Sequence, residues 1–523
     1  MTRDFSHGRH AGLLVPLFSI PSRESWGIGE IPDLVRFGRW AAVAGFGFAQ
    51  LLPLNEMAEG QNSPYSALSA MAIDPIFIAP AHVQEIETLG GELVLDPGEH
   101  ELLRRARESR IIEYQAVRVL KHRVFRLAFE RFVSEEWLRR TARAQQLDAF
   151  VEREQWWLHD YTLFRALHAR EEGRHWLQWS APLRAREPAA LEHERGELYR
   201  EVLYYAYLQW LADEQWTAVR DQCEVGLFGD FPFMVSGDSA DVWSRQEDFC
   251  LDASVGTPPD AFSQTGQDWG FPAYRWTHVA QKGFEWLAAR ARRSAELYDG
   301  YRVDHLVGFF RTYVRKKDGP AAFVPPDEPS QIAQGERLLN LFRAAGAHVI
   351  VEDLGLIPDF VRDSLARLAV PGYKVLRWER DWHAVGQPFR DPLHYPSCSV
   401  ATSGTHDTET LAEWWDGAPE TERAAALAIP CLRETSCDPA APFLAETRDA
   451  ILDLLFASGS DLLLLPIQDV FGWRDRINTP ALVDDRNWTW RLPWPVEDLM
   501  MEREAKERGA FTHALATKHE RIG

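Results

Sequence analysis

The sequence has 523 residues, of which 46% are hydrophobic and 26% charged, and these proportions exclude a disordered or fibrous chain. The formal net charge at pH 7 is −21, which repels phosphate backbones and anionic lipids. We therefore expect neither nucleic acid nor a membrane as a partner, whereas a neutral substrate is unaffected by this charge.

The five cysteines are scattered along the chain and form no CxxC motif. A sparse, odd set of this kind is typical of reduced thiols and predicts a cytoplasmic protein. The apolar stretch Leu13–Ile20 is short and contains Pro16, which is unlike a signal peptide. The best membrane candidate, Leu452–Ile467, is interrupted by Ser458 and Asp461, so we expect no spanning helix.

Tryptophan is unusually frequent, with 21 residues in an aromatic fraction of 12%. A Trp-rich core is the interpretation that composition favours. The alternative is that some of these flat rings stack on the faces of sugar rings.

Short apolar runs of strand length recur along the chain. They are Gly12–Phe18, Phe48–Leu54, Gly226–Val235, Tyr301–His305, His348–Glu352, Tyr373–Trp378, Ser399–Thr405 and Asp461–Ile467. Continuous apolar strands fit a parallel sheet that is covered on both faces. Helical patterns, such as residues 332–345 and 445–458, separate most of the runs. Eight strands with crossover helices predict an α/β protein with a (β/α)8 TIM barrel.

We expect a single catalytic barrel over residues 1–523 with two additions. The interval between the second and third strands is far too long for one crossover, and much of it is charged and amphipathic. It predicts an inserted, mostly helical subdomain at residues 80–222, with a solvated, salt-bridged surface. Residues 236–278 are rich in Gly, Pro, Asp and Trp and predict an active-site loop region.

Acidic side chains stand at or just after the carboxyl ends of four predicted strands: Asp230, Asp304, Glu352 and Asp407. Because TIM barrels place their chemistry at this end, we expect the four side chains to converge on one mouth. A single strand-end Asp is commonly a helix cap, but four such acids together favour an active site.

Converging carboxylates can hold a metal ion or cleave glycosidic bonds. The chain has no HExxH, CxxC or calcium-loop spacing, no phosphate-binding glycine motif and no GxSxG, so we expect no metal and no cofactor. Glycosidic chemistry needs a carboxylate nucleophile and a carboxylic acid, and a third carboxylate can offset the developing positive charge. His305 and His406 each neighbour one of these acids; they are either structural or hydrogen-bond a sugar hydroxyl.

A series of short motifs runs through nearly the whole chain. In order they are WGIGEIPDL (26–34), NSPYSALSAMAIDPIFI (62–78), GDFPFMVSGDSADVW (229–243), GTPPDAFSQTGQDWGFPAYRW (256–276), RVDHLVGF (302–309), VEDLG (351–355), GTHD (404–407), NTP (478–480) and NWTWRLP (487–493). Through them the sequence resembles the 4-α-glucanotransferases (amylomaltase, or disproportionating enzyme) of glycoside hydrolase family 77, which are related to the α-amylases. Each motif is modest evidence, but their joint order is highly specific.

The resemblance implies that Asp304 is the nucleophile, Glu352 the general acid/base and Asp407 the transition-state stabiliser. Arg302 stands two residues before Asp304, so its side chain lies on the same face of the strand. We expect its charge to keep Asp304 ionised.

The resemblance also implies a set of sugar-binding residues. Asp230, His305 and His406 would bind the sugar at the cleavage point. Tyr65 would offer a stacking face there, and Asn478 would supply a hydrogen bond.

The motif at residues 256–276 is expected to cover the site and to exclude water, with Phe262 and Trp269 among its aromatic residues. The sequence departs from the family pattern after Gly308, where it reads FFRTYVRKKDGP instead of a run like FEAYW. TET also follows GTHD in place of the common ND. These departures leave the catalytic acids in place, leave the acceptor and chain-length preference open, and indicate a divergent branch of the family.

The implied reaction moves a segment of a 1,4-α-D-glucan from a malto-oligosaccharide donor to the 4-OH of an acceptor glucan or glucose, with retention. Retention requires the carboxyl groups of Asp304 and Glu352 to lie about 5–5.5 Å apart. Two alternatives stay open, an α-glucan hydrolase and a non-catalytic glucan-binding relative. Formation of longer oligosaccharides from maltotriose separates transfer from hydrolysis, and the intact set of three acids argues against a non-catalytic protein.

Overall fold

The computed structural model describes residues 3–5, 7–58, 60–259, 266–480 and 485–521. Eight parallel strands close into a barrel in chain order, and β12 pairs back onto β1. They are β1 (His10–Leu14), β2 (Phe48–Gln50), β3 (Gly226–Phe231), β6 (Gly300–Val303), β9 (His348–Val351), β10 (Gly372–Val375), β11 (Ser399–Thr402) and β12 (Leu462–Pro466). The predicted TIM barrel is confirmed. The observed strands stop earlier than the apolar runs, because the chain turns there into the loops that carry the polar residues.

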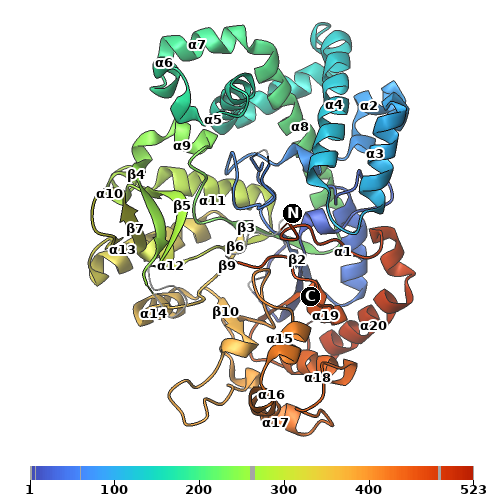
Figure 1. Cartoon of the computed structure of the whole chain (residues 1–523), viewed down its shortest axis with the longest axis vertical. Helices are drawn as coiled ribbons and strands as arrows, with labels where there is room; N and C mark the ends of the chain where they lie inside the picture. The colour runs from blue at the N-terminus through green and yellow to red at the C-terminus, as the bar shows by residue number, and fades with distance from the viewer. Residues whose placement is uncertain (1–2, 6, 59, 260–265, 481–484, 522–523) are drawn as a thin grey trace.

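Helices cover the outside of the barrel (Figure 1). Those outside the interval between β2 and β3 are α1 (Asp33–Val43), α9 (Ala240–Ser244), α10 (Trp276–Gln281), α11 (Glu285–Leu297), α12 (Val307–Phe310), α13 (Glu328–Ala344), α14 (Asp359–Leu368), α15 (Leu411–Gly417), α16 (Glu420–Leu427), α17 (Pro430–Arg433), α18 (Ala445–Phe456), α19 (Ile467–Phe471) and α20 (Arg503–Lys518). In the described part of the chain, no helix combines the length and apolar character needed to cross a membrane.

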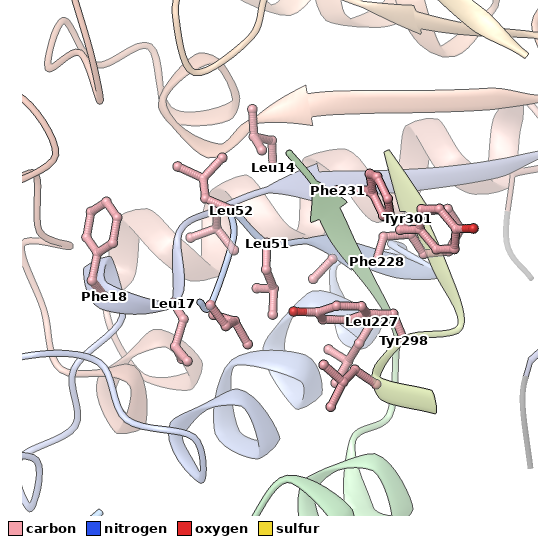
Figure 2. Packing of buried hydrophobic residues seen from close by; sticks show 14 of the residues in the cluster. Leu14, Leu17, Phe18, Leu51, Leu52, Leu227, Phe228, Phe231, Tyr298 and Tyr301 are labelled. Carbon is pink, nitrogen blue, oxygen red and sulfur yellow. The ribbon is translucent and has the colours of Figure 1, made fainter. Parts of the chain in front are cut away.

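Strand β3 shows why apolar runs form this barrel. All of its residues are buried, and Figure 2 shows Phe228 and Phe231 among buried rings and aliphatic side chains. The ring of Phe231 stacks on Tyr301 of the neighbouring strand, with 5.9 Å between centroids. Gly229, which lies between Phe228 and Phe231 in β3, has no room for a side chain, because a Cβ there would lie 2.3 Å from the ring of Tyr298. This close packing fixes the strand end that carries Asp230.

Among the described residues, seven α-helices occupy the long interval between β2 and β3 and lie in the upper part of Figure 1. They are α2 (Gln84–Leu89), α3 (Pro97–Glu108), α4 (Tyr114–Phe132), α5 (Ala142–Arg170), α6 (Ala181–Arg184), α7 (Pro188–Glu197) and α8 (Tyr199–Gln222). A buried ion pair joins them to the barrel: Nζ of Lys121 in α4 lies 2.6 Å from Oε1 of Glu30, just before α1. The same amine donates to the carbonyls of Ile76 and Ile78, so its three protons are all used.

A second, antiparallel sheet lies beside the barrel, at the left in Figure 1. Its order is β5 (Gln267–Tyr274), β4 (Phe249–Thr257), β7 (Thr312–Lys316) and β8 (Ala322–Val324). The Gly and Pro content of residues 236–278 predicts a loop region. In the structure this segment also contributes two strands of the sheet, β4 and β5. The sequence pattern of these two strands is weak because β4 and β5 pair with register shifts. In addition, β4 pairs with β7, which comes from the divergent stretch after Gly308.

Candidate active site

Arg302 lies at the centre of the converging acids. It pairs in register with Asp230 across β3 and β6, and its Nη1 donates to Oδ2 of Asp230 at 2.5 Å. Its Nη2 donates to Oδ1 of Asp304 at 2.8 Å and to Oε2 of Glu352 at 2.6 Å. The arginine side chain is 3% exposed and Asp230 is fully buried, whereas Asp304 and Glu352 are 22% and 24% exposed and face the mouth.

The shared nitrogen limits how far apart the two outer carboxyl groups are. Since Oδ1 of Asp304 and Oε2 of Glu352 lie 2.8 Å and 2.6 Å from the same atom, they are at most about 5.4 Å apart. Carboxyl groups of inverting glycosidases stand about 6.5–9.5 Å apart to admit a water, and those of retaining enzymes about 5–5.5 Å. The observed limit excludes the first geometry and allows the second.

The backbone at His305 orients Glu352. The N–H of His305 donates to Oε2 of Glu352 at 2.9 Å. His305 has φ of +42°, a left-handed conformation that non-glycine residues seldom adopt. Strain of this kind is commonly retained where it aims a functional group, here an amide proton that stabilises a carboxylate.

Burial and the nearby charges of Glu352 and Asp230, opposed by Arg302, raise the pKa of Asp304 to about 8. Burial also opposes ionisation of Glu352, but Arg302 and the amide of His305 outweigh it and lower the pKa of Glu352 below its usual value. The two carboxyls therefore share one proton in the unliganded protein. Arg302 acts in the expected direction, since its charge lowers the pKa of Asp304, but burial opposes this effect and the same charge also serves Asp230 and Glu352.

Asp407 is held ionised on the other side of the site. Nδ2 of Asn478 donates to its Oδ1 at 2.6 Å, and Nε2 of His406 lies 3.4 Å from its Oδ2. Burial opposes the charge, but His406 and the two side-chain contacts outweigh it and lower the pKa of Asp407. The charge of Asp407 in turn raises the pKa of His406 against the effect of burial.

Tyr65 links these two groups of acids. Its hydroxyl donates to Oδ2 of Asp230 at 2.8 Å and lies 3.1 Å from Nε2 of His406. Its ring stacks on that of His406, with 5.6 Å between centroids and an angle of 18° between planes. The expected sugar-stacking residue is thus tied into the polar network by its hydroxyl.

Sequence reasoning missed Trp488, which packs against the same pair. Its ring centroid lies 5.8 Å from both Tyr65 and His406, and the residue has φ of +66°. Its carbonyl accepts a hydrogen bond from Tyr114 of α4 at 2.9 Å. The motif NWTWRLP contains Trp488, but nothing in that motif indicates its contact with Tyr65, which lies more than 400 positions earlier in the sequence.

The cover residues are only partly described. Trp269 of β5 lies edge-on to the ring of His305, with 4.7 Å between centroids, so the antiparallel sheet reaches the site. Phe262 lies outside the described residues. The structure thus brings together all the other expected site residues, namely Tyr65, Asp230, Trp269, Arg302, Asp304, His305, Glu352, His406, Asp407 and Asn478.

Within the described residues, no group of three or more His, Cys, Asp and Glu side chains is arranged to hold a metal ion. At the mouth, the positively charged guanidinium of Arg302 stands between Asp230, Asp304 and Glu352. A TIM barrel with paired carboxyls at its strand ends and a third carboxylate opposite defines the class of barrel enzymes that act on glycosidic bonds.

Comparisons with known proteins narrow this class. Residues 15–497 match the family model of glycoside hydrolase family 77, described as 4-alpha-glucanotransferase. The chain is 31% identical over 511 residues to a 4-alpha-glucanotransferase from Chlamydia pneumoniae, covering 94% of this chain and 93% of that one. It is 32% identical over 536 residues to one from Thermus thermophilus, covering 98% and 99%. The chain belongs to the 4-alpha-glucanotransferase family, glycoside hydrolase family 77.

Solved structures of amylomaltases have the same fold as this chain. The amylomaltase from Streptococcus agalactiae, in complex with acarbose, superposes with a TM-score of 0.82 at 25% identity, over 98% of this chain and all of the other. The amylomaltase from Corynebacterium glutamicum has the same fold, with a TM-score of 0.79 at 24% identity over 96% of this chain and 75% of that one.

Proposed function

We propose that Asp304, Glu352 and Asp407 carry out glucan transfer by a retaining double displacement. As a member of its family, the chain is a 4-alpha-glucanotransferase that acts on α-1,4-glucans. The observation that carries the assignment of residues is the single Nη2 of Arg302 that binds both Asp304 and Glu352. It supports a separation suited to direct attack on the sugar rather than to attack by an interposed water.

In the first step, Glu352 gives its proton to the glycosidic oxygen while a carboxylate oxygen of Asp304 bonds to the anomeric carbon. The bond from that carbon to the leaving oxygen breaks, and the departing chain leaves with a free 4-OH. Attack requires the proton that the pair shares to lie on Glu352 while Asp304 is ionised. The two carboxyls are neighbours, so this proton can pass between them without an outside group.

In the second step, Glu352 removes the proton from the 4-OH of the acceptor, and that oxygen attacks the anomeric carbon. The ester bond to Asp304 breaks, and both acids return to their starting states. Asp407, which stays ionised, opposes the positive charge that develops on the sugar in both steps.

The donor in this proposal is a malto-oligosaccharide, and the acceptor is another glucan or glucose. Tyr65, Asp230, His305, His406 and Asn478 bind the sugar at the cleavage point. All of them are neutral or already paired groups that can exchange a hydrogen bond for one to a hydroxyl. The proposed location is the cytoplasm, which five free cysteines support.

Incubation with maltotriose and separation of the products by size tests the proposal. We expect glucose together with oligosaccharides longer than maltotriose, and no product from Asp304→Asn. Asp353→Asn is the matched control, because it is the neighbouring acid in the sequence and its carboxyl accepts from the amide of Tyr373 at 2.7 Å. Shorter products alone would assign hydrolysis, and an active Asp304→Asn protein would remove the nucleophile from the mechanism.

A further inference from the structure

Most tryptophan side chains are buried or partly buried, which agrees with the composition. Among the described residues the exposed ones are Trp156, Trp378 and Trp382, with exposed fractions of 41%, 42% and 52%. Trp156 lies on α5, in the inserted helices. The other two lie within five residues of each other, in the segment that follows β10 at the carboxyl end of the barrel.

Residues 379–390 form a hairpin that is closed by backbone hydrogen bonds. An antiparallel bridge joins Arg380 to Phe389, and the amide of Asp381 donates to the carbonyl of Pro388 at 2.9 Å. Trp382 lies near the tip of this hairpin, and its ring is exposed to solvent. Exposed apolar side chains gathered in one place commonly mark a binding surface.

A cation holds the ring of Trp382 from one side. The guanidinium of Arg380 lies 5.5 Å from the Trp382 ring and 4.3 Å from the Phe389 ring, and its Nε donates to the carbonyl of Gln387 at 2.9 Å. Arg380 therefore fixes the ring on the hairpin. Val385 at the tip is fully exposed and extends the apolar surface.

The root of the hairpin is anchored to the active-site face. Arg377, 5% exposed, donates to Oε2 and to the carbonyl oxygen of Glu409 at 2.9 Å and 2.8 Å. Glu409 follows the proposed stabiliser Asp407 by two residues. Trp378 comes next to Arg377, and at most about 3.5 Å per residue separates its Cα from that of Trp382, so the tip lies within about 14 Å of the root.

We propose that the hairpin at residues 379–390 is a docking surface for the α-glucan chain outside the catalytic centre, with the ring of Trp382 as its main contact. The proposal rests on the proposed function, because the occupant is the same polymer. The flat, amphipathic indole packs against the apolar face of a glucose ring while polar groups meet the hydroxyls. The chain carries a net charge of −21, which does not repel a neutral polymer such as an α-glucan.

A contact of this kind discriminates substrates by length. A glucan that is long enough to reach both the hairpin and the acids binds the second of these two sites at a high effective concentration. A trisaccharide reaches only one of the two sites. One exposed stacking contact corresponds to an affinity change of about 3- to 10-fold. The hairpin therefore favours long glucans without changing the chemistry.

The test compares amylose with maltotriose in the full-length protein. We expect Trp382→Ala to raise the KM for amylose about 3- to 10-fold relative to the KM for maltotriose, and Trp382→Tyr to restore most of the difference. Trp156→Ala is the matched control, with the same residue type and similar exposure on α5, and should leave the ratio unchanged. Native gels containing amylopectin provide a second readout without catalysis, in which Trp382→Ala should migrate faster than the wild type.

A protein that transfers maltotriose, and whose KM ratio and gel mobility do not respond to Trp382→Ala, overturns the docking surface and leaves the proposed function intact. A protein that produces nothing from either substrate contradicts the proposed function instead, while the gels still test the hairpin. An oligomeric state that changes in Trp382→Ala, with an unchanged ratio, would assign the surface to a second copy of the chain and overturn the proposal.

Discussion

Arg302 donates from Nη2 to Oε2 of Glu352 at 2.6 Å, from a position in which its guanidinium is almost completely buried. The same group also binds Asp230 and Asp304, so one positive charge serves three acids. A buried charge shared in this way is hard to replace, since each acid loses its partner at once. This relationship makes Arg302 the residue through which the electrostatics of the site can best be tested.

Arg302→Lys should lower kcat/KM by about 100- to 1000-fold, the cost of removing oriented donors from a transition state. Lysine keeps the charge, but a single ammonium cannot span the carboxyls as a planar guanidinium does. Steady-state kinetics with maltotriose measure the effect. Arg508→Lys, a buried arginine of α20 paired with Asp449, is the control, and equal losses in the two variants would contradict the specific role of Arg302.

The pH profile of kcat/KM should fall on its alkaline side near pH 8, where the proton shared by Asp304 and Glu352 is lost. The negative charge of Asp230 is among the causes that raise the pKa of Asp304. Asp230→Asn removes this charge, so the pKa should fall and the alkaline limb should move to lower pH. A limb that stays in place or moves upward would contradict the shared-proton model, whatever the change in maximal rate.

Trp488 offers a test of whether its ring or its backbone matters. Trp488→Phe keeps a ring beside Tyr65 and His406 in a strained left-handed backbone, whereas Trp488→Gly relaxes the backbone and removes the ring. If the ring positions its two neighbours, Trp488→Phe should stay within about tenfold of the wild-type kcat and Trp488→Gly should lose about 100-fold. Thermal unfolding of both variants separates this effect from loss of the fold. An active glycine variant would assign Trp488 a purely conformational role.

Lys121 tests how the inserted helices are held. Lys121→Met leaves the carboxylate of Glu30 buried without its cation and should lower the free energy of unfolding by about 3–5 kcal/mol. The double variant with Glu30→Gln removes the unpaired charge and should recover part of this loss. Urea unfolding measures both, and equal stability of the single and double variants would contradict the buried, unpaired charge of Glu30 as the cause of the loss.

The barrel could be predicted because each element carries its own local signal. Residues 349–351 of β9 are apolar, and helix α14 begins directly after Pro358, so both are visible in short windows. The acids follow by topology alone, since the carboxyl ends of parallel strands meet at one end of a barrel. Their identities as nucleophile and acid came from the resemblance and not from this argument.

Other features depend on contacts between distant segments. Strands β4 and β7 pair across more than fifty residues, and one comes from a stretch that departs from the family pattern. The raised pKa of Asp304 follows from burial and from the charges of Glu352 and Asp230 on other strands, which no sequence window around Asp304 contains. The amide of Asn478 was expected to reach the sugar, and in the structure it donates to Asp407.

The central claim is that Asp304 forms a bond to the sugar. The most direct measurement uses the Glu352→Gln protein with α-glucosyl fluoride, whose leaving group needs no acid, so that the first step proceeds and the second is slowed. Peptide mass spectrometry should then find one hexosyl group on the peptide that contains Asp304. A hexosyl group on Asp407 or Asp230, or an unlabelled protein that still releases fluoride at the wild-type rate, would contradict the mechanism.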